Sequence, residues 1–300
     1  MSLEIKNLSK TFKSKSKEVH ALNNINLTVG SGEIICVLGH NGAGKTTLIK
    51  SICGLLRPDD GYVSIDGRIV DKNRRYAHQH CGAVLEGSRN IYYYLSAYEN
   101  IRYFGLLNGL AQNQIDLFAE KYLKLFDLIE FRNTPASAFS RGMQQKVAII
   151  IALMKQPDIL LLDEPTLGLD IISSDSVIQI LKQLAEEQKQ TIIITTHDVH
   201  LIEELNSRLV FMNHGKIIRD CKLIDFELLQ NESKYKITFL GTKLELPKDA
   251  RNIECHDGYI YFETVSYDWI QKKLNDNSLV QIEKLKPSIA EVYKGVMEEL

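Results

Sequence analysis

The segment Gly39–Thr47, with the sequence GHNGAGKTT, has the residue types and spacing of a phosphate-binding loop. Its glycines would let successive backbone N–H groups curl around a phosphate, because a Cβ would block close approach or forbid positive φ. Lys45 would supply a point charge to the β- and γ-phosphates, and the Thr46 hydroxyl would reach Mg²⁺. Nucleotide contacts are therefore expected from Gly39, His40, Asn41, Gly42, Ala43, Gly44, Lys45, Thr46 and Thr47.

Two adjacent carboxylates, Asp163 and Glu164, follow the apolar run Ile159–Leu162. Open α/β sheets build their sites at the carboxyl ends of such strands. Asp163 is suited to hold Mg²⁺ through a water, while Glu164 is free to polarise an attacking water as a general base. The pair alone could be a solvated acidic turn, but beside a phosphate loop it indicates hydrolysis of a nucleoside triphosphate.

The elements that must position these residues are those of an α/β fold. Ile34–Leu38 enters the phosphate loop as a buried strand, and the unbroken apolar runs at 159–162 and 192–194 are typical of central parallel strands. Helical spacing at 174–188 predicts the crossover helix between the last two. The core sheet should therefore be largely parallel.

Other segments predict additions to this core. Strand-like runs at 3–7 and 25–29 flank a polar loop, Lys10–Lys17, and Asp66-Gly67 marks a tight hairpin, so an antiparallel N-terminal part is expected. Helical spacing from Ala97 to Leu128 predicts an inserted helical block. Beyond residue 230 short strands and a helix at 267–274 indicate a small α+β domain.

Composition excludes several classes. The 36 basic and 38 acidic residues nearly balance, so no global field draws the chain to nucleic acid or anionic lipid. The five cysteines are scattered without a C-x-x-C pair, which argues against zinc and disulfide frameworks and favours core thiols in a reducing cytosol. The longest apolar run, Val147–Met154, is far short of the ~20 residues that a membrane helix needs, so we expect no transmembrane helix.

A third motif, FSRGMQQK at Phe139–Lys146, resembles the signature sequence of the ATP-binding cassette (ABC) ATPases. Ser140 is a candidate N-cap, so the N–H groups of the following helix could meet a γ-phosphate. In that family the phosphate belongs to the opposite subunit. The resemblance therefore implies that Ser140 and Gly142 contact the nucleotide of a second copy.

Further matches follow in family order over about residues 1–229. Asp170 resembles the residue of the loop that crosses the dimer interface, and His197 resembles the switch histidine beside the γ-phosphate. Phe12 stands where the family places an aromatic ring on the adenine. Glu86 occupies the position of a glutamine that contacts Mg²⁺, and a glutamate there can still ligate the metal.

The resemblance implies a P-loop ABC ATPase core at 1–230, with a mixed sheet and a helical subdomain at about 87–155, followed by a small α+β accessory or regulatory domain at 231–300. Arg141 and Met143 in the signature, and the ending Lys286–Tyr293, resemble drug, antibiotic and bacteriocin exporter ATPases whose permease is a separate chain. The tyrosines Tyr92, Tyr93 and Tyr94 are too many to bury on one face, and in similar proteins this region contacts the permease.

The expected function is that of an exporter ATPase: two copies sandwich ATP and Mg²⁺, and drive a separate permease from the cytoplasmic face of the membrane. Lys45, Glu164 and His197 would be the catalytic residues; Thr46, Asp163 and Glu86 would hold the metal. The alternatives are an importer ATPase with the same catalytic residues, a soluble ABC ATPase that acts on DNA or ribosomes, and a small-molecule kinase. The kinase reading leaves Phe139–Lys146 unexplained.

Overall fold

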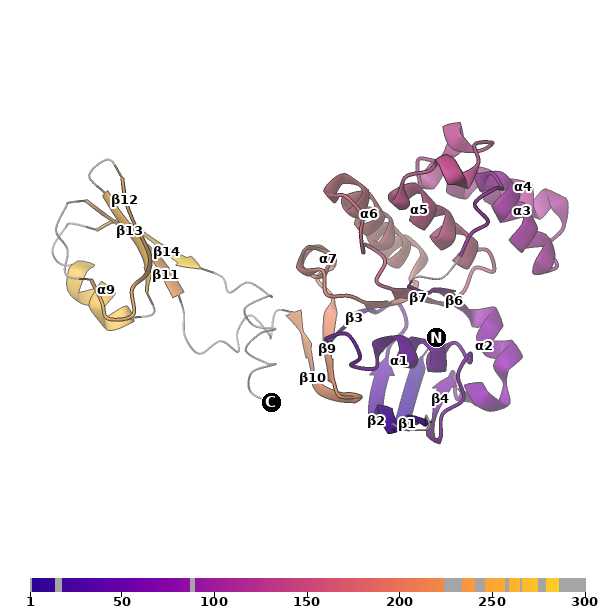
Figure 1. The fold of residues 1–300 in the computed structure, drawn as a ribbon, viewed down its shortest axis with the longest axis horizontal. Coiled ribbons are helices and arrows are strands. Elements are labelled where there is room, and N and C mark those ends of the chain that lie inside the picture. The colour runs from indigo at the N-terminus through magenta and orange to yellow at the C-terminus, as the bar shows by residue number, and fades with distance from the viewer. Residues whose placement is uncertain are drawn as a thin grey trace. The chain divides into compact units, whose positions relative to one another are not determined.

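The computed structural model describes residues 2–13, 18–86, 90–223, 234–240, 246–256, 259–264, 266–274 and 279–285. The chain divides into two compact units, Met1–Lys222 and Leu223–Leu300 (Figure 1). The boundary expected near residue 230 lies outside the described residues. We describe each unit by itself.

The first sheet of the N-terminal unit is antiparallel and has the order β2-β1-β4-β5. Its strands are β1 (Leu3–Lys13), β2 (Glu18–Val29), β4 (Asp60–Ile65) and β5 (Arg68–Ile69). The predicted hairpin at Asp66-Gly67 is confirmed, since φ is 47° at Asp66 and 74° at Gly67, as a tight two-residue turn requires. The antiparallel N-terminal part is thus present.

The lysine-rich stretch was predicted as a loop from Lys10 onward, and this was wrong for Lys10–Lys13. The ladder between β1 and β2 continues to the pairs Phe12↔Val19 and Lys13↔Glu18. Exposed charges can follow a strand when acidic partners lie across it. Here the Lys10 Nζ atom lies 2.7 Å from Asp59 Oδ1. Backbone pairing therefore keeps Lys10–Lys13 in the strand, with the charge of Lys10 paired to that of Asp59.

The second sheet has six strands in the order β10-β9-β3-β8-β7-β6. Its members are β3 (Ile34–Leu38), β6 (Cys81–Val84), β7 (Ile159–Asp163), β8 (Thr191–Thr195), β9 (Arg208–Asn213) and β10 (Lys216–Lys222). All neighbouring pairs are parallel except β9 and β10. Every residue of β7 and β8 is buried, as expected for strands covered on both faces.

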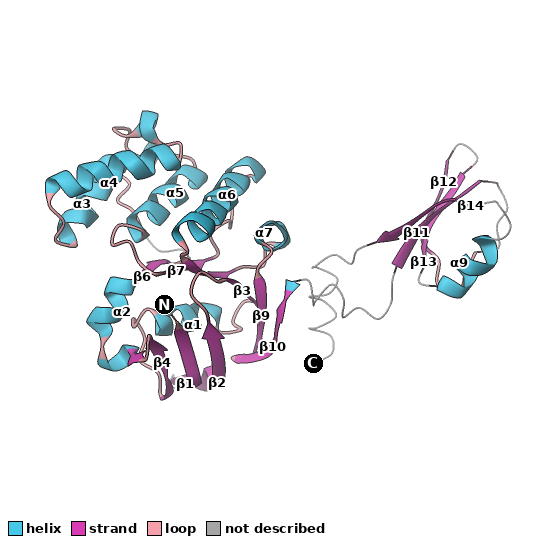
Figure 2. Cartoon of the chain, turned by 180° about the vertical axis from the view of Figure 1, so that it is seen from behind, coloured by secondary structure: helices cyan, strands magenta, loops and turns pink. Residues whose placement is uncertain are grey.

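Helices cover this sheet on both faces. α1 (Lys45–Ile52) lies between the two sheets, where Leu48 and Ile49 join a core shared with β1, β2 and β4 (Figures 1 and 2). α6 (Ile171–Gln188) and α7 (Val199–Leu205) lie on the opposite face (Figures 1 and 2). The crossover helix, predicted to start at residue 174, starts at Ile171. A further helix, α2 (Arg74–His80), directly precedes β6.

The predicted helical block is present between β6 and β7 (Figure 2). It contains α3 (Ala97–Leu107), α4 (Gln112–Leu125) and α5 (Arg141–Ala152), with short 3-10 turns at Ile129–Phe131 and Ala136–Ala138. A further 3-10 turn, Val70–Lys72, precedes α2. Ser96 caps α3 by accepting a hydrogen bond from the Glu99 N–H at 3.2 Å, and the Glu99 carboxylate accepts one from the Ser96 N–H at 2.8 Å. The tyrosines before α3 are exposed as expected, with 93% of Tyr94 accessible.

The C-terminal unit is α+β, as predicted. Its sheet has the order β12-β13-β11-β14, with β11 (Lys234–Leu240), β12 (Arg251–His256), β13 (Tyr259–Thr264) and β14 (Leu279–Leu285). α9 (Tyr267–Leu274) contributes Ile270 to a core with Ile237, Phe239, Ile260 and Phe262. The sequence did not predict β12, and the ending Lys286–Tyr293 lies outside the described residues.

The expectation of core thiols holds for part of the cysteines. Cys36 and Cys53 are buried, and burial raises the pKa of Cys53 to about 11. Cys81 and Cys221 are half-buried, but Cys255 is exposed, so the prediction was wrong for that residue. The reason is position: Cys255 lies on β12, an edge strand of the small sheet.

Candidate functional site

The phosphate loop connects β3 to α1, and the neighbouring backbone requires two of its glycines. A Cβ on Gly39 would lie 2.4 Å from the carbonyl oxygen of Met212, and one on Gly44 would lie 2.2 Å from that of Ala21. Gly44 is also the N-cap residue of α1 with φ of 105°. Only glycine tolerates both the close approach and this backbone conformation. The surrounding backbone therefore constrains the shape of the loop.

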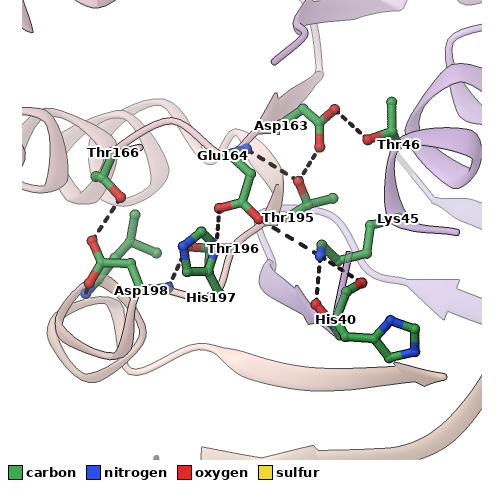
Figure 3. Close-up of polar contacts among 12 residues, drawn as sticks. His40, Lys45, Thr46, Asp163, Glu164, Thr166, Thr195, Thr196, His197 and Asp198 are labelled. Atoms are coloured by element: carbon green, nitrogen blue, oxygen red, sulfur yellow. Dashed lines mark hydrogen bonds and ion pairs between the residues drawn. The ribbon is translucent and has the colours of Figure 1, made fainter. Parts of the chain in front are cut away.

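Lys45 is held at the centre of this loop. Its side chain is 8% exposed, and its Nζ atom donates a hydrogen bond to the Gly39 carbonyl oxygen at 2.6 Å. The same atom lies 3.4 Å from the His40 carbonyl oxygen and 3.8 Å from Glu164 Oε1 (Figure 3). The ammonium group is thus fixed next to the backbone amides that the sequence assigned to phosphate.

Asp163 is the last residue of β7, and its buried carboxylate accepts hydrogen bonds from two hydroxyl groups. The Thr46 hydroxyl donates to Oδ2 at 2.8 Å, and the Thr195 hydroxyl donates to Oδ1 (Figure 3). The sequence prediction included Asp163 and Thr46 but missed Thr195. A signal was available, because Thr195 ends the apolar run of β8 and is paired with Asp163 across the parallel ladder.

Glu164 is also buried and has φ of 52°, an uncommon conformation for a residue with a side chain. Its N–H donates to the carbonyl oxygen of Thr195 at 3.0 Å, which secures that backbone geometry. The carboxylate turns toward His197, whose Nδ1 atom lies 2.9 Å from Oε2 (Figure 3). The three residues predicted to be catalytic, Lys45, Glu164 and His197, therefore meet in one place.

The loops after β7 and β8 are bonded to each other, which holds this arrangement. The Thr166 hydroxyl donates to Asp198 Oδ2 at 2.7 Å. Asp198 also caps α7, because its Oδ1 accepts the N–H of His200 at 3.1 Å. Glu164 lies two residues before Thr166, and His197 directly precedes Asp198. This bond therefore connects the loops that carry Glu164 and His197, and sequence reasoning missed it.

A cavity of about 350 Å³ opens over the loop. Phe12 lies on its wall with 45% of its surface exposed, next to Val19 on the paired strand. The exposed Glu86 contributes to the same wall. The cavity is lined by Phe12, Val19, Ala21, His40, Asn41, Gly42, Ala43, Gly44, Lys45, Thr46, Thr47, Glu86, Asp163 and Glu164.

Ser140, Gly142 and Asp170 are not among the residues that line this cavity. Ser140 caps α5, as predicted, by accepting the Met143 N–H at 3.2 Å, and Asp170 caps α6 by accepting the Ser173 N–H at 2.9 Å. The hydrogen bonds from Ser173 lower the pKa of Asp170. Gly142 is buried where a Cβ would lie 2.6 Å from the Ser173 Cβ, so it permits close packing of α5 on α6. Contact of Ser140, Gly142 and Asp170 with a nucleotide stays a prediction.

Comparison with known proteins shows to which family the chain belongs. The family profile described as "ABC transporter" matches residues 22–167. The ABC transporter ATP-binding protein NatA of Bacillus subtilis (strain 168) is 39% identical over 210 residues, which cover 70% of this chain and 85% of that protein. The chain belongs to the ABC transporter family. It is an ATPase subunit of a transporter.

The chain is also similar to a second named transporter protein and to a solved structure. Methionine import ATP-binding protein MetN 1 of Listeria monocytogenes is 34% identical over 306 residues, covering 99% of this chain and 88% of that protein. A solved structure, the ATP-binding cassette MJ0796 as a dimer in a post-hydrolysis state with ADP and Pi, matches with a TM-score of 0.67. It is 31% identical, and the match covers 74% of this chain and 98% of the cassette.

Proposed function

We propose that this ABC subunit binds ATP together with Mg²⁺, hydrolyses it at Glu164, and thereby drives a separate membrane permease. One observation carries the proposal: Lys45, Asp163 and Glu164 line one cavity at the carboxyl ends of parallel strands, with His197 bonded to Glu164. The phosphate-loop amides and Lys45 would stabilise the charge of the transferred phosphoryl group. Phe12, at the wall of the same cavity, would stack on the adenine.

Mg²⁺ fits the oxygen atoms present. The buried Asp163 carboxylate and the Thr46 hydroxyl lie within hydrogen-bond distance of each other, and hard oxygen ligands together with substrate phosphates are the usual surroundings of Mg²⁺. Thr46 and Asp163 would hold the ion, and Glu86 on the cavity wall could add a further carboxylate oxygen. When bound, Mg²⁺ neutralises phosphate charge.

Glu164 has the surroundings of a general base. Its carboxylate is 7% exposed, so few waters compete for it, and His197 holds one oxygen in place. We propose that Glu164 accepts the proton of the water that attacks the γ-phosphate, and that His197 positions both the carboxylate and the phosphate. Lys45 would exchange its present carbonyl partners for phosphate oxygens.

The active unit is proposed to be a homodimer. Ser140, Gly142 and Asp170 lie outside the cavity of their own chain but at or next to the N-termini of α5 and α6, where N–H groups favour anions. The similar cassette MJ0796 is a dimer in its solved structure. Each nucleotide would therefore be completed by the Ser140 region of the second copy.

The permease is proposed to be a separate chain, with this subunit bound to it at the cytoplasmic face. Among the helices that the structure describes, none combines the length and apolar character that a membrane crossing needs. The exposed tyrosines Tyr92, Tyr93 and Tyr94 remain our predicted contact with the permease.

The direction of transport has two candidates. Several similar proteins are named as methionine import ATP-binding proteins. Their names favour import over the export that the sequence predicted. Export stays as the second candidate because of Arg141 and Met143 in the signature. Purification of this subunit with its permease and reconstitution with the ATPase outward tests the choice. ATP-driven loss of labelled methionine from the lumen would support import of methionine; export predicts solute accumulation in the lumen.

Glu164→Gln tests the catalytic proposal. The substitution keeps the size of the side chain but removes its basicity, so turnover should fall by about 10²- to 10⁴-fold while ATP still binds. A dimer should then accumulate with ATP and Mg²⁺ on size-exclusion chromatography, and Ser140→Arg should abolish it by blocking the shared site. Glu186→Gln on the exposed face of α6 is the control. Full ATPase activity in Glu164→Gln would refute the role of Glu164.

A further inference from the structure

The turn between β9 and β10 lies directly against the phosphate loop. The Gly215 N–H donates a hydrogen bond to the Ala43 carbonyl oxygen at 3.0 Å, and the Met212 carbonyl oxygen occupies the space that a Cβ on Gly39 would need. The Gly215 carbonyl oxygen in turn accepts the Asn23 N–H at 2.8 Å. The hairpin thus touches the loop at both its first and its middle residues.

The side chain of His40 makes a second connection between these two segments. Its Nε2 atom lies 2.8 Å from Asn213 Oδ1, and its Nδ1 atom lies 2.7 Å from the Asn41 carbonyl oxygen. The ring points away from Glu164 and His197 (Figure 3). The carbonyl oxygen of the same residue lies 3.4 Å from Lys45 Nζ. His40 therefore links Asn213 on one side to the phosphate-binding lysine on the other.

Asparagine has the hydrogen-bonding capacity that this position needs. A carbonyl oxygen only accepts, so Nδ1 of His40 must donate to Asn41. In the neutral imidazole Nε2 then accepts, and Asn213 must present its NH₂ group; in the imidazolium Nε2 donates, and Asn213 must present its oxygen. The amide can turn to meet either state. Asn213 can therefore keep the link in both protonation states of the ring.

We infer that Asn213 is a positioning residue for ATP: through His40, it fixes the phosphate loop in the shape that receives the triphosphate. The inference rests on the proposed nucleotide site. Sequence reasoning assigned His40 to the phosphates as one loop member among nine, whereas the geometry directs its ring to the hairpin. Asn213 itself has no part in the motifs, because it is 173 residues away from His40 along the chain.

A double-mutant cycle tests this inference. Asn213→Leu should raise the Kd for ATP about 3- to 10-fold, the effect of one net hydrogen bond. His40→Phe should raise it by a similar factor, and the double variant should be no weaker than either single one, because both remove the same link. Lys216→Ala, at the exposed start of β10, is the matched control and should leave the Kd unchanged. Thermal unfolding without nucleotide accompanies each titration.

Asn213→Gln supplies a second measurement, rescue by a conservative variant, that a purely structural role would not give. Glutamine keeps an amide that both donates and accepts hydrogen bonds, so it can restore the link to Nε2 of His40 that leucine removes. The Kd of Asn213→Gln for ATP should therefore lie closer to that of the native protein than the Kd of Asn213→Leu does.

The inference would be overturned by additive losses in the cycle, by a lower unfolding temperature with unchanged Kd in Asn213→Leu, or by a Kd for Asn213→Gln as high as that of Asn213→Leu. Native protein that fails to bind ATP would instead refute the proposed function. Native protein that binds ATP, with Asn213 variants that bind equally well, would refute only the role of Asn213.

Discussion

The Nδ1 atom of His197 lies 2.9 Å from Oε2 of Glu164. Oε1 of the same carboxylate lies 3.8 Å from Lys45 Nζ, so both oxygens face nitrogen donors. The two partners of the short contact differ in exposure: 59% of the His197 side chain is accessible but only 7% of that of Glu164. His197 thus stands between solvent and the buried carboxylate, and the contact holds the orientation of that carboxylate.

His197→Ala should lower kcat by about 10²- to 10³-fold, the usual effect of removing one group that stabilises a transition state. The Kd for ATP should change little, because the binding groups of the phosphate loop remain. Steady-state ATPase rates and nucleotide titration measure the two quantities. His78→Ala on the exposed face of α2 serves as the control. An unchanged kcat would remove His197 from the mechanism.

Asp163→Asn should weaken binding of ATP with Mg²⁺ about 10- to 100-fold, because a charge-assisted contact contributes roughly 1.5–3 kcal/mol. Binding of ATP in EDTA should stay the same, since the phosphate loop and Lys45 are unaltered. Calorimetric titrations with and without Mg²⁺ provide the comparison within one variant. Equal losses in both conditions would show that Asp163 acts on the loop rather than on the metal.

Phe12→Ala should weaken ATP binding by about 1–3 kcal/mol, the range for base–aromatic stacking. The ring is 45% exposed at the wall of the cavity, so its removal should leave the unfolding temperature nearly unchanged. Phe131→Ala removes a ring of similar exposure, 43%, in the helical block and is the control. Lower stability with intact affinity would identify Phe12 as a packing residue.

His200 and Asp175 predict a pH effect on stability. His200 Nε2 lies 2.6 Å from Asp175 Oδ1, and this hydrogen bond raises the pKa of His200 above the ordinary 6.5. A histidine with a raised folded-state pKa contributes stability that is fully present below its unfolded pKa and is lost as pH rises through the folded pKa.

Urea unfolding across pH 6 to 9 should therefore show a larger difference between native protein and His200→Gln at the acidic end. The effect should be small, because both side chains are about half exposed and the solvent screens them. A difference that stays constant with pH, or one that grows toward alkaline pH, would contradict the assignment.

Residues that are contiguous in sequence could be grouped before the structure was known. In Gly39–Thr47 and Asp163–Glu164 the required groups are neighbours along the chain, and the structure brings residues of both segments together in one cavity. Thr195 and Asn213 reach the same site only because β8 and β9 flank β3. No spacing along the sequence encodes that strand order. The apolar run that ends at Thr195 offered a signal for that residue, whereas Asn213 could not be identified before the topology was known.

Pattern reasoning also failed where strands lack an apolar face. In β12 every residue from Arg251 to Cys255 is exposed. A strand that buries neither face has no need of alternating apolar and polar residues, which is the sequence pattern used to recognise strands. The continuation of β1 through Lys10–Lys13 was missed for the same reason. Backbone pairing, which is independent of side-chain type, holds both segments in place.

β3 carries hydrogen-bonded ladders on both edges, with β8 on one side and β9 on the other. The amide hydrogens of Ile35–Leu38 should therefore be among the slowest to exchange with solvent. Local unfolding next to the phosphate loop would disrupt two ladders at once. β6, at the edge of the sheet, has a ladder on one side only and leads toward the helical block. Separating β6 from the sheet would therefore break fewer backbone hydrogen bonds than separating β3.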